Sequence, residues 1–301
     1  MSTRAAQAVI GTPERSPDIG LQDDDQGPRG REQPGIERGY TEPCHARRAG
    51  MTGTSTAMIA RQHELVGQTV VLIGGSAGIG LDTARRARAE GAEVILVGRR
   101  AQTLAQAARE VDALGRAAFD ANDSTALAGF FRSLRDPVDH VFVTGPGPFY
   151  KPLLEMDVAE VRRALSDHIV LALEVARNAA PKMRPPGTLL FMGGTSGRRI
   201  DHGLGIVSAA TNSMPSFVAA LARELAPVRV NLIAAGFVDT PLSASLLGDQ
   251  LEARREELRR TLPIGRVVGP ADVAALAVHV MSNTALTGAT YDIDGGQQFV
   301  A

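Results

Sequence analysis

The chain has 301 residues and a formal net charge of −1, which gives no electrostatic reason to expect nucleic acid or an anionic membrane as partner. Its single cysteine excludes an intrachain disulfide, a cysteine-based zinc cluster and a CxxC redox motif, and we expect no metal site. We find no apolar run of the roughly 18 residues that a membrane span needs and no secretory signal, so we expect a cytoplasmic protein.

The first 57 residues have the composition of a tail. They mix Pro, Gly, Arg and acidic residues and show little apolar periodicity. Met51 and Met58 stand just before the first regular pattern. We predict that one of them is the true start and that the preceding stretch is disordered or the product of a misplaced start; a functional tail is the alternative. Residues 58–301 then form a single domain.

From residue 68 onward, apolar β-rich runs alternate with Ala/Arg/Leu stretches of helical length. The pattern predicts strands at 69–74, 93–98, 116–120, 138–144, 188–192, 228–233 and 290–293. It predicts helices at 79–90, 101–114, 124–134, 158–183, 207–225, 251–262 and 272–281. Because near-continuous apolar strands that alternate with helices are buried on both faces, we expect an α/β fold: Rossmann-like and doubly wound, with a mainly parallel seven-stranded sheet.

The first predicted strand leads into the turn Gly74-Gly75-Ser76-Ala77-Gly78-Ile79-Gly80, which opens the first helix. Glycines allow a tight turn and let backbone N–H groups approach a pyrophosphate at the helix N-terminus. A plain strand-to-helix turn also favours glycine. Here, however, a strand precedes the turn, a helix follows it, and a second strand ends about 20 residues later, so the context predicts dinucleotide binding.

The second predicted strand ends in Gly98-Arg99-Arg100. An acidic residue at this position would hydrogen-bond a ribose 2′-hydroxyl, whereas guanidinium groups bind a 2′-phosphate in bidentate fashion. The sequence therefore predicts NADP(H) rather than NAD(H) as the cofactor. The alternative is that one or both arginines are ordinary solvated surface residues.

Over about residues 65–299 the chain resembles the short-chain dehydrogenase/reductase family. The resemblance lies in the glycine turn, in Asp120 after the third strand, and in the stretches 231–241 and 291–296, with Ala235 where Pro is usual. It implies that Asp120 contacts adenine and that Val238 and Thr240 lie near the nicotinamide. It also implies a homodimer or homotetramer built on the helix 158–183 and the helix from Val207. The full set of predicted cofactor contacts is Gly74, Ser76, Gly78, Ile79, Gly80, Arg99, Arg100, Asp120, Thr144, Gly145, Val238 and Thr240.

Members of this family reduce carbonyls with a Tyr acid that is supported by a Lys four residues later, a Ser and an Asn. The three tyrosines of this chain are followed four residues on by Cys44, Leu154 and Gly295, so Tyr-x-x-x-Lys is absent in every register. Alignment by strands and helices gives the residues at the four positions: Val207 for Tyr, Thr211 for Lys, Gly194 for Ser and His168 for Asn. All four catalytic residue types are replaced.

Other polar groups near the predicted cleft are candidates for proton transfer: His202, Ser196, Tyr150 and Ser208. Histidine side chains titrate near neutrality, which favours His202. Each candidate has a plainer interpretation as an ordinary loop residue, and Ser208 as part of the helix N-terminus. His168, on a long predicted helix, has the plainer interpretation of a packing or interface residue.

These observations favour an NADP(H)-dependent oxidoreductase with a non-standard active site, reducing a carbonyl, an activated C=C or an imine of a small molecule. Residues 237–262 would form the loop that covers this substrate. One alternative is a catalytically silent NADP(H)-binding sensor or partner subunit, which would bind NADPH without chemistry. The other is a non-redox isomerase or cyclase on the same scaffold, whose activity would survive without cofactor.

Overall fold

The computed structural model of the protein describes residues 64–145, 147–198 and 200–300, so the predicted tail and both candidate start methionines lie outside the described residues. Its strands are β1 (Thr69–Ile73), β2 (Glu93–Gly98), β3 (Gly115–Ala118), β4 (Val138–Val143), β5 (Met183–Gly194), β6 (Arg229–Ala235) and β7 (Thr290–Ile293). Its α-helices are α1 (Gly78–Ala89), α2 (Ala101–Glu110), α3 (Ser124–Ser133), α4 (Val158–Leu165), α5 (Leu171–Ala179), α6 (Gly205–Glu224), α7 (Pro241–Leu247), α8 (Leu251–Thr261) and α9 (Pro270–Ser282).

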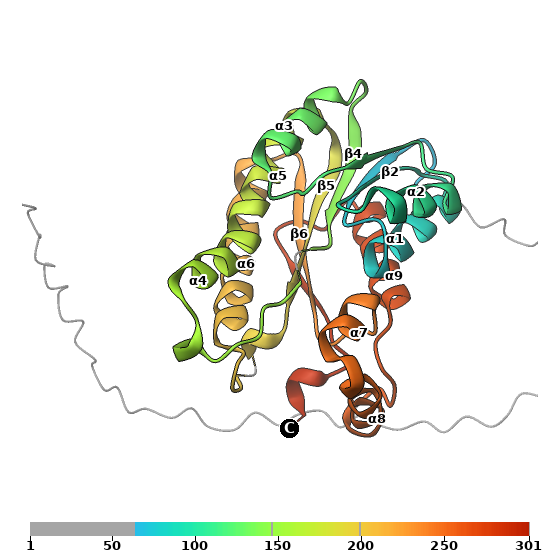
Figure 1. Cartoon of the computed structure of the whole chain (residues 1–301). Coiled ribbons are helices and arrows are strands. Elements are labelled where there is room, and N and C mark those ends of the chain that lie inside the picture. Colours follow the sequence, from blue (N-terminus) through green and yellow to red (C-terminus); the bar gives the residue numbers. More distant parts are fainter. Residues whose placement is uncertain (1–63, 146, 199, 301) are drawn as a thin grey trace, which may run out of the picture. The chain divides into compact units, whose positions relative to one another are not determined.

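The seven strands form one parallel sheet in the order β3-β2-β1-β4-β5-β6-β7 (Figure 1). Apolar side chains of α3, α5 and α6 cover one face, and those of α1, α2 and α9 cover the other. The predicted doubly wound, Rossmann-like fold is therefore confirmed. Because the strand order reverses between β1 and β4, the carboxyl ends of these two strands form the crevice in which such folds bind ligands.

The helical stretch predicted over residues 158–183 is confirmed from Val158 to Lys182, but it is not one uniform α-helix. α4 begins in a capping box, in which the backbone N–H of Glu160 donates to Asp157 (2.7 Å) and the Glu160 side chain accepts from the backbone N–H of Asp157 (3.0 Å). A π-helical segment, Ser166–Val170, then separates α4 from α5. Single π turns inside helices occur frequently at functional sites.

Strand β5 begins earlier than predicted and includes Pro185 and Pro186. These prolines do not break the sheet because the β4–β5 register shifts between Val138 and His140, at the point where they lie. No ladder hydrogen bond is lost at such an irregularity. The two prolines therefore mark a bulged strand start rather than only a helix end.

Helix α7 lies where the sequence predicted only a loop, and α6 begins two residues earlier than predicted. The α7 N-terminus is capped by Thr240, whose hydroxyl accepts from the Ser243 backbone N–H (3.2 Å), and Pro241 follows at the first helical position. A helix of seven residues is too short to show a 3.6-residue period clearly, which explains why the pattern missed it.

Helix α6 is long and apolar enough, by length and composition alone, to span a membrane, although it contains polar residues that interrupt any continuous apolar run. Half of it is buried inside the domain, with Met214 and Val218 among the core residues packed on the sheet. Core helices of folded domains pass the same test.

The amino-terminal edge of the sheet holds a buried polar network. Arg229 donates hydrogen bonds of 2.7–3.2 Å to five backbone carbonyls, those of Pro186, Val280, Met281, Asn283 and Leu286, and so closes the C-terminus of α9. His140 bonds Gln68 Oε1 (2.6 Å) and accepts from the Thr188 N–H (3.3 Å). Burial, reinforced by the positive charge of Arg229, lowers the pKa of His140 to about 3, so its ring is neutral.

Candidate functional site

The glycine turn joins β1 to α1 in a conformation that only glycine fits. Gly74 has a φ of 96°, and the backbone N–H groups of Gly74 and Gly75 both donate to the Val97 carbonyl (2.9 and 3.1 Å). A Cβ at Gly80 would collide with the carbonyl of Gly74. The turn therefore packs strand against helix without side chains, which leaves its outer surface open to a ligand.

The N-terminus of α1 faces the end of β2. The N-cap residue is Ala77, which has no side-chain acceptor and makes no capping hydrogen bond. Ser76 lies against the end of β2, because a Cβ at Gly98 would be 3.1 Å from its Oγ. Ile79 packs on the core below. The first amide groups of α1 are thus not occupied by a side-chain cap, as anion binding at a helix N-terminus requires.

Arg99 and Arg100 follow directly after β2 and are exposed. In the part of the chain that the structure describes, neither guanidinium makes a hydrogen bond or an ion pair. The positive charge of Arg99 does reach Asp167, whose pKa it lowers. Both arginines therefore follow the strand end that packs against Ser76 of the glycine turn, and their role toward a 2′-phosphate stays a prediction.

The end of β4 lies on the other side of the same turn. Thr144 donates to the carbonyl of Ile73 through its backbone N–H (2.9 Å) and its hydroxyl (3.2 Å). A Cβ added at Gly145 would meet nothing within 4 Å, so this residue borders open space. Of the predicted nicotinamide-side residues, Thr240 lies near the turn, since a Cβ at Gly78 would be 3.4 Å from its Cγ2. Val238 is buried instead, in a bridge with Val268.

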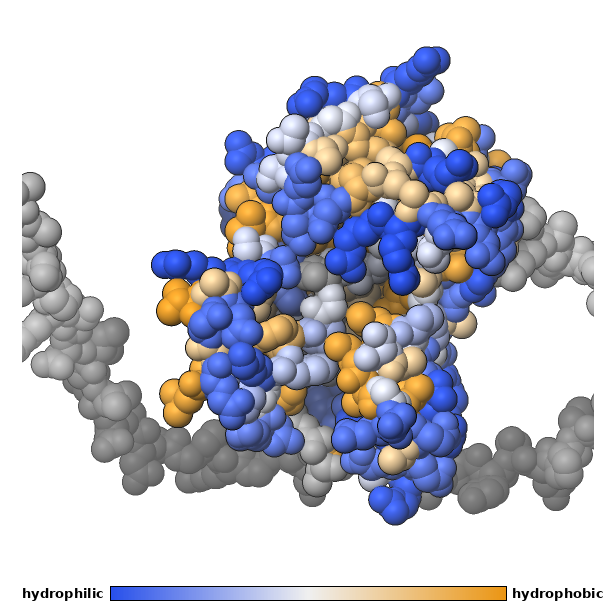
Figure 2. Space-filling model, viewed as in Figure 1, coloured by the Kyte–Doolittle hydropathy of each residue, from blue (hydrophilic) through white to orange (hydrophobic). Residues whose placement is uncertain are grey.

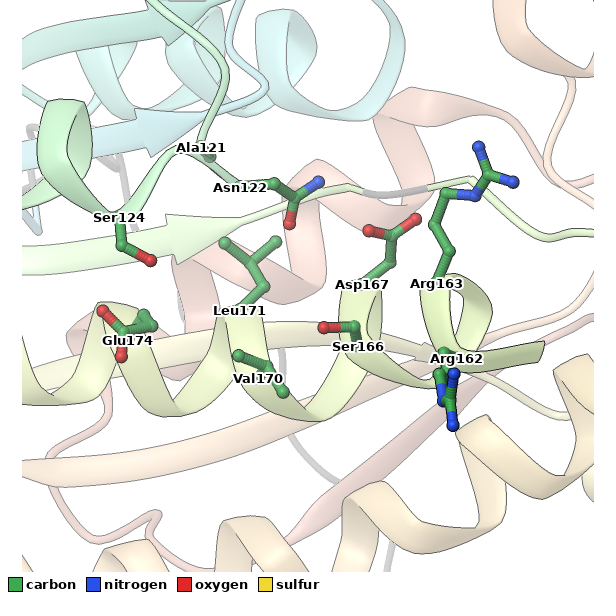
Figure 3. A pocket seen from close by; sticks show the side chains of 10 residues that line it. All are labelled: Ala121, Asn122, Ser124, Arg162, Arg163, Ser166, Asp167, Val170, Leu171 and Glu174. Atoms are coloured by element: carbon green, nitrogen blue, oxygen red, sulfur yellow. The ribbon is translucent and has the colours of Figure 1, made fainter. Parts of the chain in front are cut away.

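A pocket of about 260 Å³ lies beside Asp120, between the loop after β3 and the helices α4 and α5 (Figure 3). Asp120 accepts from the Asn122 N–H (3.1 Å), whereas Asp123, not Asp120, caps α3. Asn122 and Asp167 point into the space between the loop and the helices (Figure 3). The remaining lining residues are Ala121, Ser124, Arg162, Arg163, Ser166, Val170, Leu171 and Glu174.

Burial raises the pKa of Asp167 in this pocket, and the neighbouring Asp120 raises it further. The positive charges of His168, Arg163 and Arg99 lower it in part. The pocket thus carries both signs of charge at the side where the family resemblance places adenine. Sequence reasoning missed Asp167, because nothing in a helical pattern distinguishes it from a solvated acid.

The positions of the family's catalytic residues come together on α6 and at the end of β5, but with different groups. Val207 and Thr211 are buried, and the Thr211 hydroxyl donates to the Val207 carbonyl (2.8 Å) and lies 3.2 Å from Ser196 Oγ. A Cβ at Gly194 would be 3.3 Å from Thr211 Cγ2, so these two positions lie side by side. Ser208 donates to the Ser196 carbonyl (3.1 Å) and does not cap the helix, contrary to its plainer interpretation.

Tyr150 and His202 lie in two loops that the structure brings together, since the Lys151 N–H donates to the Gly203 carbonyl (3.1 Å). Both side chains are exposed. Partial desolvation by neighbouring atoms raises the pKa of Tyr150 although the side chain is 54% exposed, and the positive charge of Arg254 on α8 lowers it in part. A tyrosine that gives up a proton near neutrality needs the opposite shift.

The outer mouth of the site is apolar. Leu242 and Leu246 on α7 are 49% and 47% exposed, and the loop after β4 approaches α7 so closely that a Cβ at Gly147 would be 2.9 Å from Leu242 Cδ2. Apolar side chains gather over α7, and the surface is hollowed between α7 and the α4–α6 side (Figure 2). Arg255 holds the loop before α7 through a bidentate ion pair with Asp239 (2.9 and 2.8 Å). The sequence carried no sign of this pair, whose members are separated by a loop and α7.

A sequence model of the family described as "Enoyl-(Acyl carrier protein) reductase" matches residues 74–298. A relative from Stachybotrys chlorohalonatus, named "Short-chain dehydrogenase/reductase ATR9", is 26% identical over 249 residues, which cover 76% of this chain and 96% of the relative. The chain belongs to the short-chain dehydrogenase/reductase family. The resemblance inferred from the glycine turn and the closing strand is thereby confirmed.

Two solved structures place this short-chain dehydrogenase/reductase among known folds. The MalC reductase/Diels-Alderase from Malbranchea aurantiaca superposes with a TM-score of 0.73 at 23% identity, over 78% of this chain and 98% of that one. BdcA in complex with NADPH has a TM-score of 0.69 at 25% identity, over 77% of this chain and 95% of that one. The likeness to MalC concerns the fold alone.

Proposed function

We propose that this short-chain dehydrogenase/reductase binds NADPH and reduces a small apolar molecule in an active site without the family's tyrosine acid. The observation that carries the proposal is the pair Arg99 and Arg100 beside a turn in which a Cβ at Gly80 would not fit. Guanidinium donors suit the 2′-phosphate, and uncapped amides at the start of α1 suit the pyrophosphate. The NADPH complex of the similar BdcA supports this choice of cofactor.

The substrate class follows from the mouth of the site and from the missing acid. Leu242 and Leu246 offer an apolar surface at the entrance. NADPH supplies the hydride, while the protein positions the substrate and provides the proton. Because activated C=C bonds and imines need less acid assistance than ketones do, these are the favoured substrates, with carbonyls as the third class.

One observation favours a second candidate, a silent NADPH-binding sensor or partner subunit. Val207 and Thr211 occupy the positions of the family's Tyr and Lys, and neither can act as the usual phenol acid or its cationic support. Such a protein would bind the cofactor and turn over nothing.

We also propose that the partner of the chain is a second copy of itself, in a homodimer or homotetramer. Leu165, Val170 and Leu173 are exposed on the helices α4 and α5 and the π segment between them. Exposed apolar side chains grouped in this way are a common mark of a protein–protein interface.

Calorimetric titration of the full chain with NADPH and with NADH tests the cofactor assignment. We expect micromolar NADPH binding, much weaker NADH binding, and no binding by Gly80→Ala. Gly129→Ala, on α3 where the nearest atom to the new Cβ is 3.9 Å away, is the matched control and should bind like the wild type. Absence of NADPH binding by the wild type would overturn the proposal.

NADPH oxidation, followed spectrophotometrically with panels of enones, imines and ketones, separates the two candidate functions. Turnover of one of these classes supports the reductase. Binding of NADPH without turnover of any panel member supports the silent binder instead.

A further inference from the structure

His168 lies in the π-helical segment between α4 and α5, on the side of the site where β4 and β5 end. Its Nδ1 is 3.0 Å from the carbonyl oxygen of Ala164. Because a carbonyl oxygen only accepts hydrogen bonds, Nδ1 carries a proton and the ring is fixed in orientation. In the described part of the chain Nε2 makes no hydrogen bond, so it is available to a ligand.

Apart from Asp167, the other residues that line the narrow cleft around His168 are apolar or glycine. Gly145 from the end of β4, Met192 from the end of β5 and Met214 from α6 line it with His168. Met214 stands one helical turn after Thr211, so the cleft borders the positions at which the family carries out its chemistry. Gly145 adds no side chain that would close the cleft toward the glycine turn.

The charged groups near His168 come from its own side of the cleft. Asp167 lines the same cleft and interacts electrostatically with His168, and also with Asp120, Arg163 and Arg99. The described lining residues that β4, β5 and α6 contribute are apolar or glycine. His168 is therefore the only cationic acid among the residues described in this lining.

Two other hydroxyl groups of the site, those of Thr211 and Ser208, already donate hydrogen bonds inside the fold. Thr211 donates to the Val207 carbonyl and Ser208 to the Ser196 carbonyl, both inside the fold. Tyr150 has its pKa raised, chiefly by partial desolvation. A reduction still needs a proton, since hydride alone leaves the product as an anion.

We propose that His168 is the proton donor of the reduction, a role that rests on the proposed NADPH-dependent function. NADPH supplies the hydride for the new C–H bond. The electron pair of the reduced double bond moves to its other atom, which is oxygen, nitrogen or the second carbon. That atom takes the proton from Nε2 of the imidazolium, whose N–H bond breaks, and solvent then returns a proton to the neutral ring.

Histidine ring ¹⁵N NMR of the full chain tests this placement without a substrate. The probes are NADP⁺ and 2′-phospho-ADP-ribose, which is NADP⁺ without the nicotinamide. We expect NADP⁺ to change the ring shifts and the titration midpoint of the His168 signal, identified by its loss in His168→Gln, and the fragment to leave them unchanged. His279, exposed on α9, is the control and should respond to neither.

The same variant tests the chemistry on any compound that the panels reveal. His168→Gln should bind NADPH like the wild type but lower kcat by about 100-fold or more, the usual contribution of general acid catalysis. The dependence of kcat on pH should also change, whereas His279→Gln, at an exposed position on α9, should keep both rate and profile.

Calorimetry first establishes that the protein binds NADP⁺. If it does, a His168 signal that NADP⁺ leaves unchanged, or that both probes change equally, overturns the donor role. An unchanged kcat and pH profile in His168→Gln overturns it as well. Absence of calorimetric binding would instead remove the proposed function and, with it, the donor role.

Discussion

The polar side chains at the two ends of the parallel strands, here called the amino-terminal and the carboxyl-terminal edge of the sheet, differ in their hydrogen bonding. At the amino-terminal edge, Arg229 donates to five carbonyls and His140 uses both ring nitrogens. At the carboxyl-terminal edge, within the described residues, the guanidinium groups of Arg99 and Arg100 make no hydrogen bond and the His168 ring makes one. Burying a polar group without a partner is costly, so satisfied groups indicate a structural role. Groups left with open donors at a strand-end crevice indicate a ligand.

The carboxyl-terminal edge includes two regions, the glycine turn and the surroundings of α6, whose polar groups differ in hydrogen bonding. Around the glycine turn, Gly80 packs closely on the carbonyl of Gly74, and no side chain caps the start of α1. Around α6, the hydroxyls of Thr211 and Ser208 are turned back into the fold. The glycine turn therefore leaves the first amide groups of α1 without a side-chain cap, whereas the hydroxyls beside α6 are used inside the fold.

The largest effect on stability is expected when the Arg229 cation is removed from the amino-terminal edge. Arg229→Met leaves the carbonyls at the end of α9 without a donor, and we expect the free energy of unfolding to fall by about 3–5 kcal/mol. Urea denaturation measures this loss. Arg223→Met, an exposed arginine on α6, is the control and should change stability little. A similar small change in both variants would contradict the assigned structural role.

The next effect concerns pH. The pKa of His140 is lowered from 6.5 to about 3 in the folded protein, so the unfolded chain takes up a proton first. The contribution of a neutral His140 is therefore fully present above pH 6.5 and is lost as the pH falls toward 3, at about 1.4 kcal/mol per pH unit. Urea titrations between these pH values should show this slope in the wild type, and its loss in His140→Gln. Equal slopes in both proteins would refute the assignment.

The last prediction concerns Arg99 at the carboxyl-terminal edge, where we expect a change in cofactor binding and almost no change in stability. Arg99→Ala removes a charge-assisted hydrogen bond to a 2′-phosphate, so we expect NADPH to bind weaker by about 1.5–3 kcal/mol, or roughly 10- to 100-fold. NADH binding and the urea midpoint should hardly change. Parallel losses for both cofactors would show that Arg99 does not recognise the 2′-phosphate.

The sequence predicted the strands and the helix around the glycine turn correctly, because their signals are local. Strands β1 and β2, the glycine turn and Arg99 follow one another within about 30 residues, the span of one βαβ unit. The helical stretch 158–183 was predicted, but the π segment inside it was not, because five residues are too few to show a changed period. Helix α7 was missed because seven residues carry too short a pattern.

By itself, then, the sequence determined the order of strands and helices, the glycine turn and the absence of Tyr-x-x-x-Lys, because these depend only on periodicity and residue type. The tertiary structure alone decided which hydroxyls are occupied, that Arg255 pairs with Asp239, and that His168 lies in the cleft with Gly145 and Met214. The physical reason is that hydrogen bonding and burial depend on distances between residues far apart in the chain, which no local pattern encodes.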